Sequence, residues 1–249
     1  MVAMMLLMLA AFASGVLNAV AGGGAFITFP ALLFAGVPPV SANVSSTVAL
    51  FPGQMASAWA YRNEIRGVTE VSVTAFSVVS LVGGVVGAIL LLTTPDRAFA
   101  GLVPWLLLFA TAVFAVGSFM PALAARLRLG GRSVLVVQFI IAIYGGYFGG
   151  GIGFLMLAAL TLFGLRDIHA MNGLRILLAA LMNGAAVAAF CLSDAVSWPE
   201  TAVMAVSAIA GGYVGAHAAK RVSRDVMKWV VVSIGVGLTL YFFIKGAGA

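Results

Sequence analysis

Long apolar stretches alternate with short polar or glycine-rich breaks from one end of the chain to the other. Most of the stretches have about 20 residues, which lets an α-helix cross a hydrocarbon layer about 30 Å thick, and two are about half as long. Hydropathy and helix breakers predict apolar helices at residues 2–20, 25–35, 43–61, 71–92, 98–119, 134–148, 152–163, 172–192, 201–219 and 229–244. The pattern is typical of an all-α integral membrane protein.

The composition supports the same class. Hydrophobic residues make up 63% of the 249 residues and charged residues only 8%. A soluble domain spends about a quarter of its residues on charge, so this chain cannot cover a surface that faces water. A cytosolic enzyme and a nucleic-acid binder are therefore excluded, despite the net charge of +6. The predicted surroundings are the lipid bilayer.

Three landmarks occur twice in the same order: a glycine triplet, a later single glycine and then an asparagine. They stand at Gly22–Gly24 and Gly149–Gly151, at Gly36 and Gly164, and at Asn43 and Asn172, with offsets of 127 to 129 positions. Landmarks in one order at nearly one offset predict an internal duplication. We assign residues 1–121 to a first repeat and residues 134–249 to a second, joined by a basic cytoplasmic linker at 122–133.

The basic residues predict how the spans are oriented, because Lys and Arg collect on the cytoplasmic side of a membrane. Three clusters stand between the spans: Arg62 and Arg66; Arg126, Arg128 and Arg132; and Lys220, Arg221, Arg224 and Lys228. All three lie inside only if an even number of crossings separates each pair. Residues 134–163 must then enter the membrane and return as a hairpin, and the duplication predicts the same for residues 2–35.

Each repeat is therefore predicted to be a broken-helix hairpin followed by three transmembrane helices. The odd number of net crossings makes the two repeats face opposite ways, which is the inverted-repeat plan of many secondary transporters. Eleven of the thirteen basic residues then lie inside, and both termini lie outside.

The glycine triplets predict where a ligand binds. A helix break inside hydrocarbon is tolerated where it lines protein or a watery cavity, and glycine permits positive φ and close backbone approach. The helices that begin near Ala25 and Ile152 have unpaired N–H groups and a partial positive charge at their N-termini, which suits an anion. We expect the two hairpin tips to meet near the midplane around a small anionic substrate. Glycine also permits close helix packing, which is expected for Gly83, Gly87, Gly211 and Gly215.

The helix after each hairpin carries polar residues on one face. Asn43 and Gln54 are eleven residues apart, as are Asn172 and Asn183, and eleven residues are close to three helical turns. Amides at membrane depth indicate a functional site by default.

Hydroxyl groups and one guanidinium join these amides. Ser46 and Thr47 fall on the first face, and Arg175 occupies the position in the second repeat that matches Ser46. Such donors suit an oxyanion. Two alternatives remain: Arg175 snorkels to the inner interface, and the hydroxyls bond back to their own helix. The predicted substrate-binding residues are Gly22, Gly23, Gly24, Asn43, Ser46, Thr47, Gln54, Gly149, Gly150, Gly151, Asn172, Arg175 and Asn183.

No motif indicates catalysis. The sequence has no Gly-x-Ser-x-Gly, no His-Glu-x-x-His, no Cys/His cluster and no paired intramembrane aspartates, so we predict no enzyme activity, no metal and no cofactor. A structural or receptor-like membrane subunit is the alternative, although such a subunit needs no pair of polar, glycine-broken hairpins.

Two segments, residues 15–33 (GVLNAVAGGGAFITFPALL) and 36–43 (GVPPVSAN), resemble the TauE/SafE family of sulfite and organosulfonate exporters. Residues 145–154 (GGYFGGGIGF) fit the second copy of that family's repeat, but no proline matches Pro30, and Arg166–Asp167 replaces Pro38–Pro39. The resemblance implies export of small sulfur-containing anions, such as sulfite or sulfoacetate, across the bacterial inner (plasma) membrane. Spacing and charge alone predict only a transporter of a small anion.

The membrane potential favours export. With the inside negative, moving one negative charge outward is favoured by about 2.3 kcal/mol per 100 mV. We therefore predict export or facilitated efflux of a small oxyanion by alternating access, and leave proton coupling and homo-oligomer formation open. The alternatives are a proton-coupled importer of a small carboxylate or sulfur anion and a non-transporting membrane subunit.

Overall fold

The computed structural model describes residues 2–20, 23–67, 71–119, 130–165, 167–218 and 224–246. These residues form helices and short connections, with no strand among them. The first half contains α1 (Val2–Val20), α2 (Ala25–Phe34), α3 (Pro39–Ala60), the 3-10 helix η1 (Arg62–Glu64), α4 (Val73–Thr93) and α5 (Asp96–Phe119). The second half contains α7 (Gly131–Tyr147), α8 (Ile152–Leu162), α9 (Ile168–Cys191), α10 (Trp198–Ala218) and α11 (Arg224–Gly246). The prediction of an all-helical protein is confirmed.

Five helices, α3, α7, α9, α10 and α11, begin three to five residues before their predicted spans. Helix α3 begins at Pro39, four residues before the predicted span, because proline is tolerated at the first helical position, where its missing N–H has no partner to lose. Helix α7 begins at Gly131, so Arg132 lies in a helix rather than in the predicted linker. Residues 122–129 of that linker lie outside the described residues.

Two of the described α-helices, α2 and α8, are much shorter than the others. Three described segments are long and apolar enough to cross a membrane: Val73–Thr93, Asp96–Val113 and Ala170–Cys191. In contrast, α2 has 10 residues and α8 has 11, about 15 Å at 1.5 Å per residue, so each runs only about halfway through a hydrocarbon core. Each short helix follows α1 or α7 after a glycine-rich turn, as the hairpin prediction requires.

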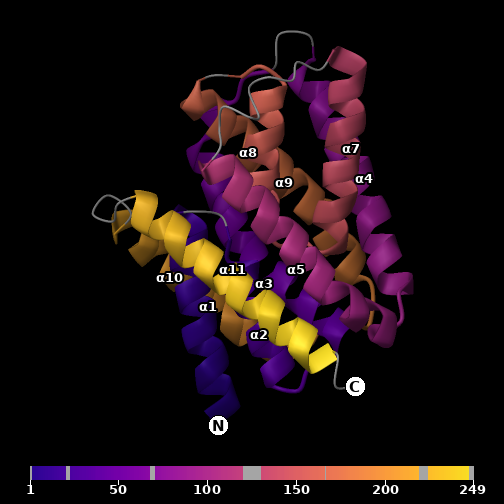
Figure 1. The fold of residues 1–249 in the computed structure, drawn as a ribbon, viewed down its shortest axis with the longest axis vertical. Helices are drawn as coiled ribbons and strands as arrows, with labels where there is room; N and C mark the ends of the chain where they lie inside the picture. The colour runs from indigo at the N-terminus through magenta and orange to yellow at the C-terminus, as the bar shows by residue number, and fades with distance from the viewer. Residues whose placement is uncertain are drawn as a thin grey trace.

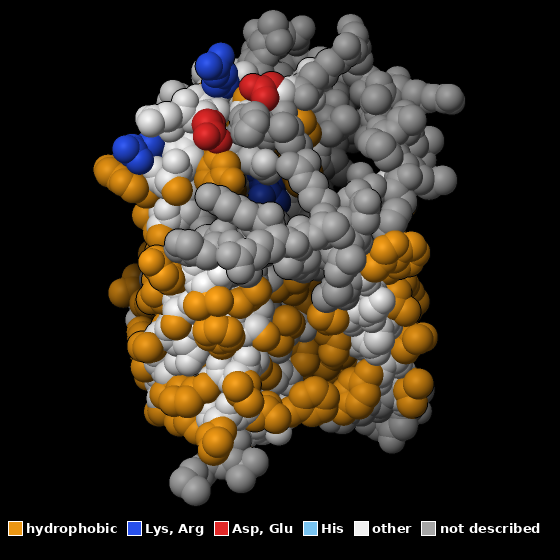
Figure 2. Space-filling model, turned by 90° about the vertical axis from the view of Figure 1, so that its left-hand side faces the viewer, with side chains coloured by type: hydrophobic (Ala, Val, Ile, Leu, Met, Phe, Trp, Pro, Cys, Tyr) orange, Lys and Arg blue, Asp and Glu red, His pale blue; other side chains and the backbone are white. Residues whose placement is uncertain are grey.

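The outer faces of the helices are apolar. On α4, Val78, Val82 and Ile89 are all exposed. Figure 2 shows one face of the molecule, where hydrophobic side chains cover the middle and lower part and charged side chains lie toward the upper end. An apolar belt of this kind matches a lipid environment.

The helices pack in pairs drawn from both halves. Helix α1 lies along α10, α4 lies along α7, and α5 lies beside α11 across the front of the molecule in Figure 1. A Cβ atom added at Gly83 or Gly87 would overlap α7, and one added at Gly211 would overlap α1. The expected packing role of these three glycines is confirmed.

Both short helices end in the same cap. Gly36 and Gly164 have φ values of +88° and +89°. The N–H of the residue after each glycine donates to the carbonyl five residues back, at 3.0 Å after Gly36 and at 3.1 Å after Gly164. This Schellman arrangement uses glycine because left-handed φ is strained for other residues. The caps direct the chain into α3 and α9, which carry the polar faces.

Candidate functional site

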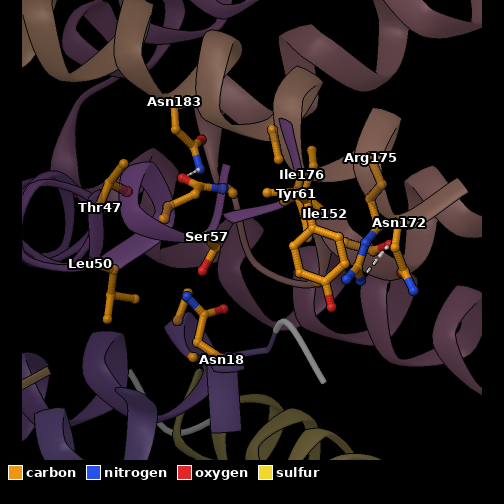
Figure 3. A pocket seen from close by; sticks show the side chains of 17 residues that line it. Asn18, Thr47, Leu50, Ser57, Tyr61, Ile152, Asn172, Arg175, Ile176 and Asn183 are labelled. Carbon is orange, nitrogen blue, oxygen red and sulfur yellow. Dashed lines mark hydrogen bonds between the residues drawn. The ribbon is translucent and has the colours of Figure 1, made fainter. Parts of the chain in front are cut away.

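A cavity of about 180 Å³ lies between the two hairpin turns and helices α3 and α9 (Figure 3). Eight of the thirteen predicted binding residues line it: Gly24, Thr47, Gln54, Gly149, Gly151, Asn172, Arg175 and Asn183. The structure therefore brings residues of both glycine triplets and of both polar helices around one hollow.

The second hairpin turn has the conformation expected for a glycine triplet. Gly149 and Gly151 have φ values of +70° and +71°, and a Cβ atom at Gly151 would lie 2.9 Å from Ala110 of α5 and 3.3 Å from the ring of Phe26 in α2. The turn is thus seated against the first hairpin. Gly150 does not line the cavity, and its carbonyl accepts a hydrogen bond from the Tyr144 hydroxyl at 2.9 Å.

The first hairpin turn is built differently. Gly24 has φ −57° and ψ −37°, a right-handed conformation open to any residue, so of the two properties expected of a glycine triplet, positive φ and close approach, this glycine uses only the second. Its carbonyl accepts a hydrogen bond from Ser14 Oγ at 2.8 Å, and a Cβ atom at Gly24 would lie 2.5 Å from the same oxygen. Glycine is needed here for space. Gly23 is buried and does not line the cavity, and Gly22 lies outside the described residues.

Two predicted residues of α3 bind protein instead of facing the cavity. Asn43 is 2% exposed and its Nδ2 donates to the carbonyl of Tyr147 at 2.9 Å. Ser46 is buried, with its Oγ 2.6 Å from that of Thr28. Asn43 thereby pairs a carbonyl at the end of α7, where the helix breaks and backbone groups lose their helical partners.

Thr47 combines both expectations. Its Oγ1 donates to the carbonyl of Asn43 at 2.9 Å, the bond to its own helix that was one of the two alternatives. The side chain also lines the cavity.

Arg175 lies at one side of the cavity and points toward the start of α8 in the second hairpin (Figure 3). Its Nη1 lies 3.5 Å from the carbonyl of Gly153 in the first turn of α8, and its Nε is buried with no partner in the described part of the chain. Figure 3 shows Asn172 and Tyr61 beside it, and the Asn172 amide makes no hydrogen bond within the described chain.

The other two amides bind each other. Asn183 Nδ2 donates to Gln54 Oε1 at 2.8 Å, which joins α9 to α3. The remaining oxygen of Asn183, Oδ1, is buried and has no partner among the described residues. Asn183 lies at the opposite side of the cavity from Arg175 in Figure 3.

Sequence reasoning missed three polar residues that line the cavity: Asn18, Ser57 and Tyr61. Ser57 and Tyr61 continue the polar face of α3 from Gln54 at helical spacings of three and four residues, a signal that was present in the sequence. Tyr61 stands where a span ends, a place typical of interface aromatic residues. Asn18 faces the cavity from α1, and no spacing within its own helix links it to the others.

Aromatic rings fill the space beside the second turn. Phe148, which precedes Gly149, packs on Phe29 and Phe99 with ring centroids 5.8 and 6.4 Å apart, and Tyr147 packs on Phe99 at 5.7 Å. None of these four rings lines the cavity. Apolar rings therefore lie toward the N-terminal end of α5, and polar side chains lie on the Tyr61 side.

Among the described residues that line the cavity, Arg175 is the one that carries a formal charge. The other polar groups are neutral amides, hydroxyls and the first residues of α2 and α8. A single guanidinium with neutral donors around it suits a ligand with one negative charge.

Comparison with known proteins agrees with these features. Residues 7–242 match the profile of a family described as "Sulfite exporter TauE/SafE". The chain is 28% identical to a probable membrane transporter protein, ORF9, of a Sinorhizobium species, over 94% of this chain and 90% of the relative. It is 28% identical to a probable membrane transporter protein of Haemophilus influenzae, over 92% and 89%. It is 25% identical to the probable membrane transporter protein YfcA of Escherichia coli K12, over 90% and 83%. No solved structure gives a significant match.

Proposed function

The chain belongs to the TauE/SafE family and is a membrane transporter, and from that premise we propose that it exports a small oxyanion. Sulfite or a short organosulfonate is the proposed substrate, and the bacterial inner membrane is the proposed location, with both termini outside.

The observation that carries the proposal is the cavity between the two hairpin turns, with one guanidinium in its wall. Ala25 at the start of α2, and Ile152 and Gly153 at the start of α8, line it together with Arg175. The N–H groups of Phe26, Ile27 and Ile152 pair with carbonyls of the turn glycines, so these helix starts attract an anion mainly through the partial positive charge of a helix N-terminus. Two helix N-termini and a guanidinium around one hollow therefore favour an anion with several acceptor oxygens.

We further propose that the two halves are inverted repeats. Two observations support this. The pairing of α1 with α10 corresponds, by position in each half, to the pairing of α7 with α4. Gln54 and Asn183, which also occupy corresponding positions, are hydrogen-bonded to each other, as expected when a pseudo-two-fold axis passes between them.

Transport then proceeds by alternating access, with the two halves rocking about the amide pair. The polar cavity lies on the side of Tyr61, next to the basic residues Arg62 and Arg66 that are predicted to be cytoplasmic. The packed rings of Phe29, Phe99 and Phe148 lie on the other side. This arrangement fits a state that receives substrate from the cytoplasm and is closed toward the outside.

The proposal is tested with purified protein reconstituted into liposomes loaded with sulfite or methanesulfonate. An inside-negative potential is imposed, and the anion released is followed with time. We expect faster release than from protein-free liposomes, and slower release when the potential is reversed, because the transported species carries negative charge. The proposal is wrong if the protein accelerates the release of no sulfite, sulfonate or carboxylate under either potential.

A further inference from the structure

We propose that the site selects a monoanion with a short, uncharged polar tail. The oxyanion group lies at Arg175 and the tail reaches the amide pair of Gln54 and Asn183. This inference rests on the proposed function and narrows its substrate class.

The positive charge in the cavity wall is confined to one side. Figure 3 shows Arg175, Asn172 and Tyr61 together on one side of the cavity and Asn183 on the other, where Asn183 is hydrogen-bonded to Gln54. No second charged side chain lines the cavity among the described residues. A second negative charge on the ligand would have no cation beside it, and an unpaired charge away from water is costly.

The uncharged amides that line the cavity have unused hydrogen-bonding capacity. Gln54 Oε1 already accepts from Asn183, which leaves the Gln54 amide nitrogen and the Asn18 amide without a hydrogen bond in the described chain. Asn183 Oδ1 also has no partner there, but it is buried and presents no surface to the cavity, so the donor open to a ligand at the amide pair is the Gln54 nitrogen. A hydroxyl group accepts a hydrogen bond from this nitrogen, whereas an apolar tail leaves it unpaired.

The cavity also has room for more than a bare oxyanion. Its volume of about 180 Å³ is far above the roughly 10–15 Å³ that a cavity needs to hold one water. A two-carbon sulfonate with a terminal hydroxyl fits such a volume. The same volume holds bare sulfite only with water beside it.

The test compares three sulfonates as inhibitors of methanesulfonate efflux from proteoliposomes. They are 2-hydroxyethanesulfonate, 1-propanesulfonate, in which a methyl replaces the hydroxyl, and sulfoacetate, which adds a second negative charge. We expect 2-hydroxyethanesulfonate to inhibit at a concentration roughly tenfold lower than either of the others. The hydrogen bond that 1-propanesulfonate lacks and the unpaired second charge of sulfoacetate each have effects of about this size.

A matched variant assigns the preference to the amide pair. The double substitution Gln54→Met with Asn183→Leu keeps the approximate shape and removes the polar groups. We expect it to abolish the preference for 2-hydroxyethanesulfonate over 1-propanesulfonate, measured as the ratio of the two inhibitory concentrations within the variant, so that a change in its overall transport rate does not affect the comparison. As the control, Arg175→Lys should weaken inhibition by all three compounds and keep their order.

Each failure has a distinct form. Suppose that the protein moves methanesulfonate, but that either 1-propanesulfonate or sulfoacetate inhibits this efflux at least as well as 2-hydroxyethanesulfonate does. The inference is then overturned, and the proposed function stands. If the double variant folds and retains the preference, the tail does not bind at the amide pair. If no anion is moved, both proposals are overturned. The comparison in the unmodified protein decides the question even where the variant does not fold.

Discussion

Helices α3 and α9 follow the two hairpins at corresponding places in the sequence, but their matching polar residues have different surroundings and different partners. Asn43 is buried and bound to the carbonyl of Tyr147, whereas Asn172 lines the cavity and has no hydrogen bond in the described chain. Ser46 is bound to Thr28, whereas Arg175 at the matching position lines the cavity. The first helix uses these positions to hold the fold, and the second presents them to a ligand.

The two hairpin turns also differ in the donors that pair their carbonyls. The carbonyl of Gly24 in the first turn accepts a hydrogen bond from Ser14 of α1, and the residue of α7 that matches Ser14 is Ile141, whose side chain has no donor. In the second hairpin the Tyr144 hydroxyl pairs the carbonyl of Gly150, and Asn43 of α3 pairs the carbonyl of Tyr147. Asn43 thus supports the second hairpin, whereas Asn172 makes no matching bond to the first hairpin in the described chain and lines the cavity.

The largest difference between the two helices is expected when Arg175 and its counterpart Ser46 are replaced in separate variants. Arg175→Ala should lower anion flux about 100-fold or more, because truncating a desolvated charged partner of a ligand costs about 2–5 kcal/mol. Ser46→Ala, the matched control at the corresponding position, should change flux less than about threefold and act on stability. Flux is measured in proteoliposomes after equal insertion is established.

A second substitution at the same position separates charge from shape. If only positive charge matters, Arg175→Lys retains part of the flux, and if the planar fork of the guanidinium matters, it does not. Equal flux for Arg175→Ala and Ser46→Ala would contradict the view that position 175 binds the anion and position 46 supports the fold.

The turns themselves should differ in their tolerance of a methyl group. Gly151→Ala should lower stability by about 2–4 kcal/mol, since left-handed φ is strained for alanine and the methyl would crowd Ala110 and Phe26. Gly24→Ala should cost less, because its backbone is right-handed and the methyl meets only the Ser14 hydroxyl and nearby atoms of α1. Thermal midpoints in detergent test the order. A larger loss for Gly24→Ala would show that the two turns are not built as described.

The matched asparagines should give opposite phenotypes. Asn43→Ala leaves the buried carbonyl of Tyr147 without its donor and should lower stability by about 1–3 kcal/mol. Asn172→Ala should leave the thermal midpoint within about 1 °C, because it removes no hydrogen bond of the described chain. Its effect should be on the half-saturating anion concentration, raised roughly tenfold. The reverse pattern, a folding defect for Asn172→Ala and an affinity defect for Asn43→Ala, would refute the comparison.

Much of the fold could be predicted because its determinants are local in the sequence. Hydropathy places most helices within a few residues, and glycine marks the ends of both short helices, where Gly36 and Gly164 adopt positive φ. The departures have local causes as well, such as Pro39 being accepted as a first helical residue.

The site could be predicted only as a set of candidates, because tertiary contacts decide which candidate faces the cavity. The hydrogen-bond partner of Asn43 is the carbonyl of Tyr147, which is 104 residues away, and no residue near Asn43 in the sequence predicts this contact. Asn18 enters the cavity from α1 through the packing of the first hairpin. The sign of φ at Gly24 depends on how that hairpin closes, which the identity of the residue does not fix.

The smallest effects should come from the caps, where the two halves are alike. Gly36→Ala and Gly164→Ala each place a methyl in open space at φ near +90°, so each should cost about 1–2 kcal/mol of backbone strain and no packing. The two losses should agree within about 0.5 kcal/mol, in contrast to the unequal losses at the turns. Gly101→Ala is the control, because it adds the same methyl in open space inside α5 and should raise stability by up to about 1 kcal/mol. Thermal midpoints of the three variants measure this, and clearly unequal losses at Gly36 and Gly164 would mean that the asymmetry between the halves extends beyond the turns to the caps that lead into α3 and α9.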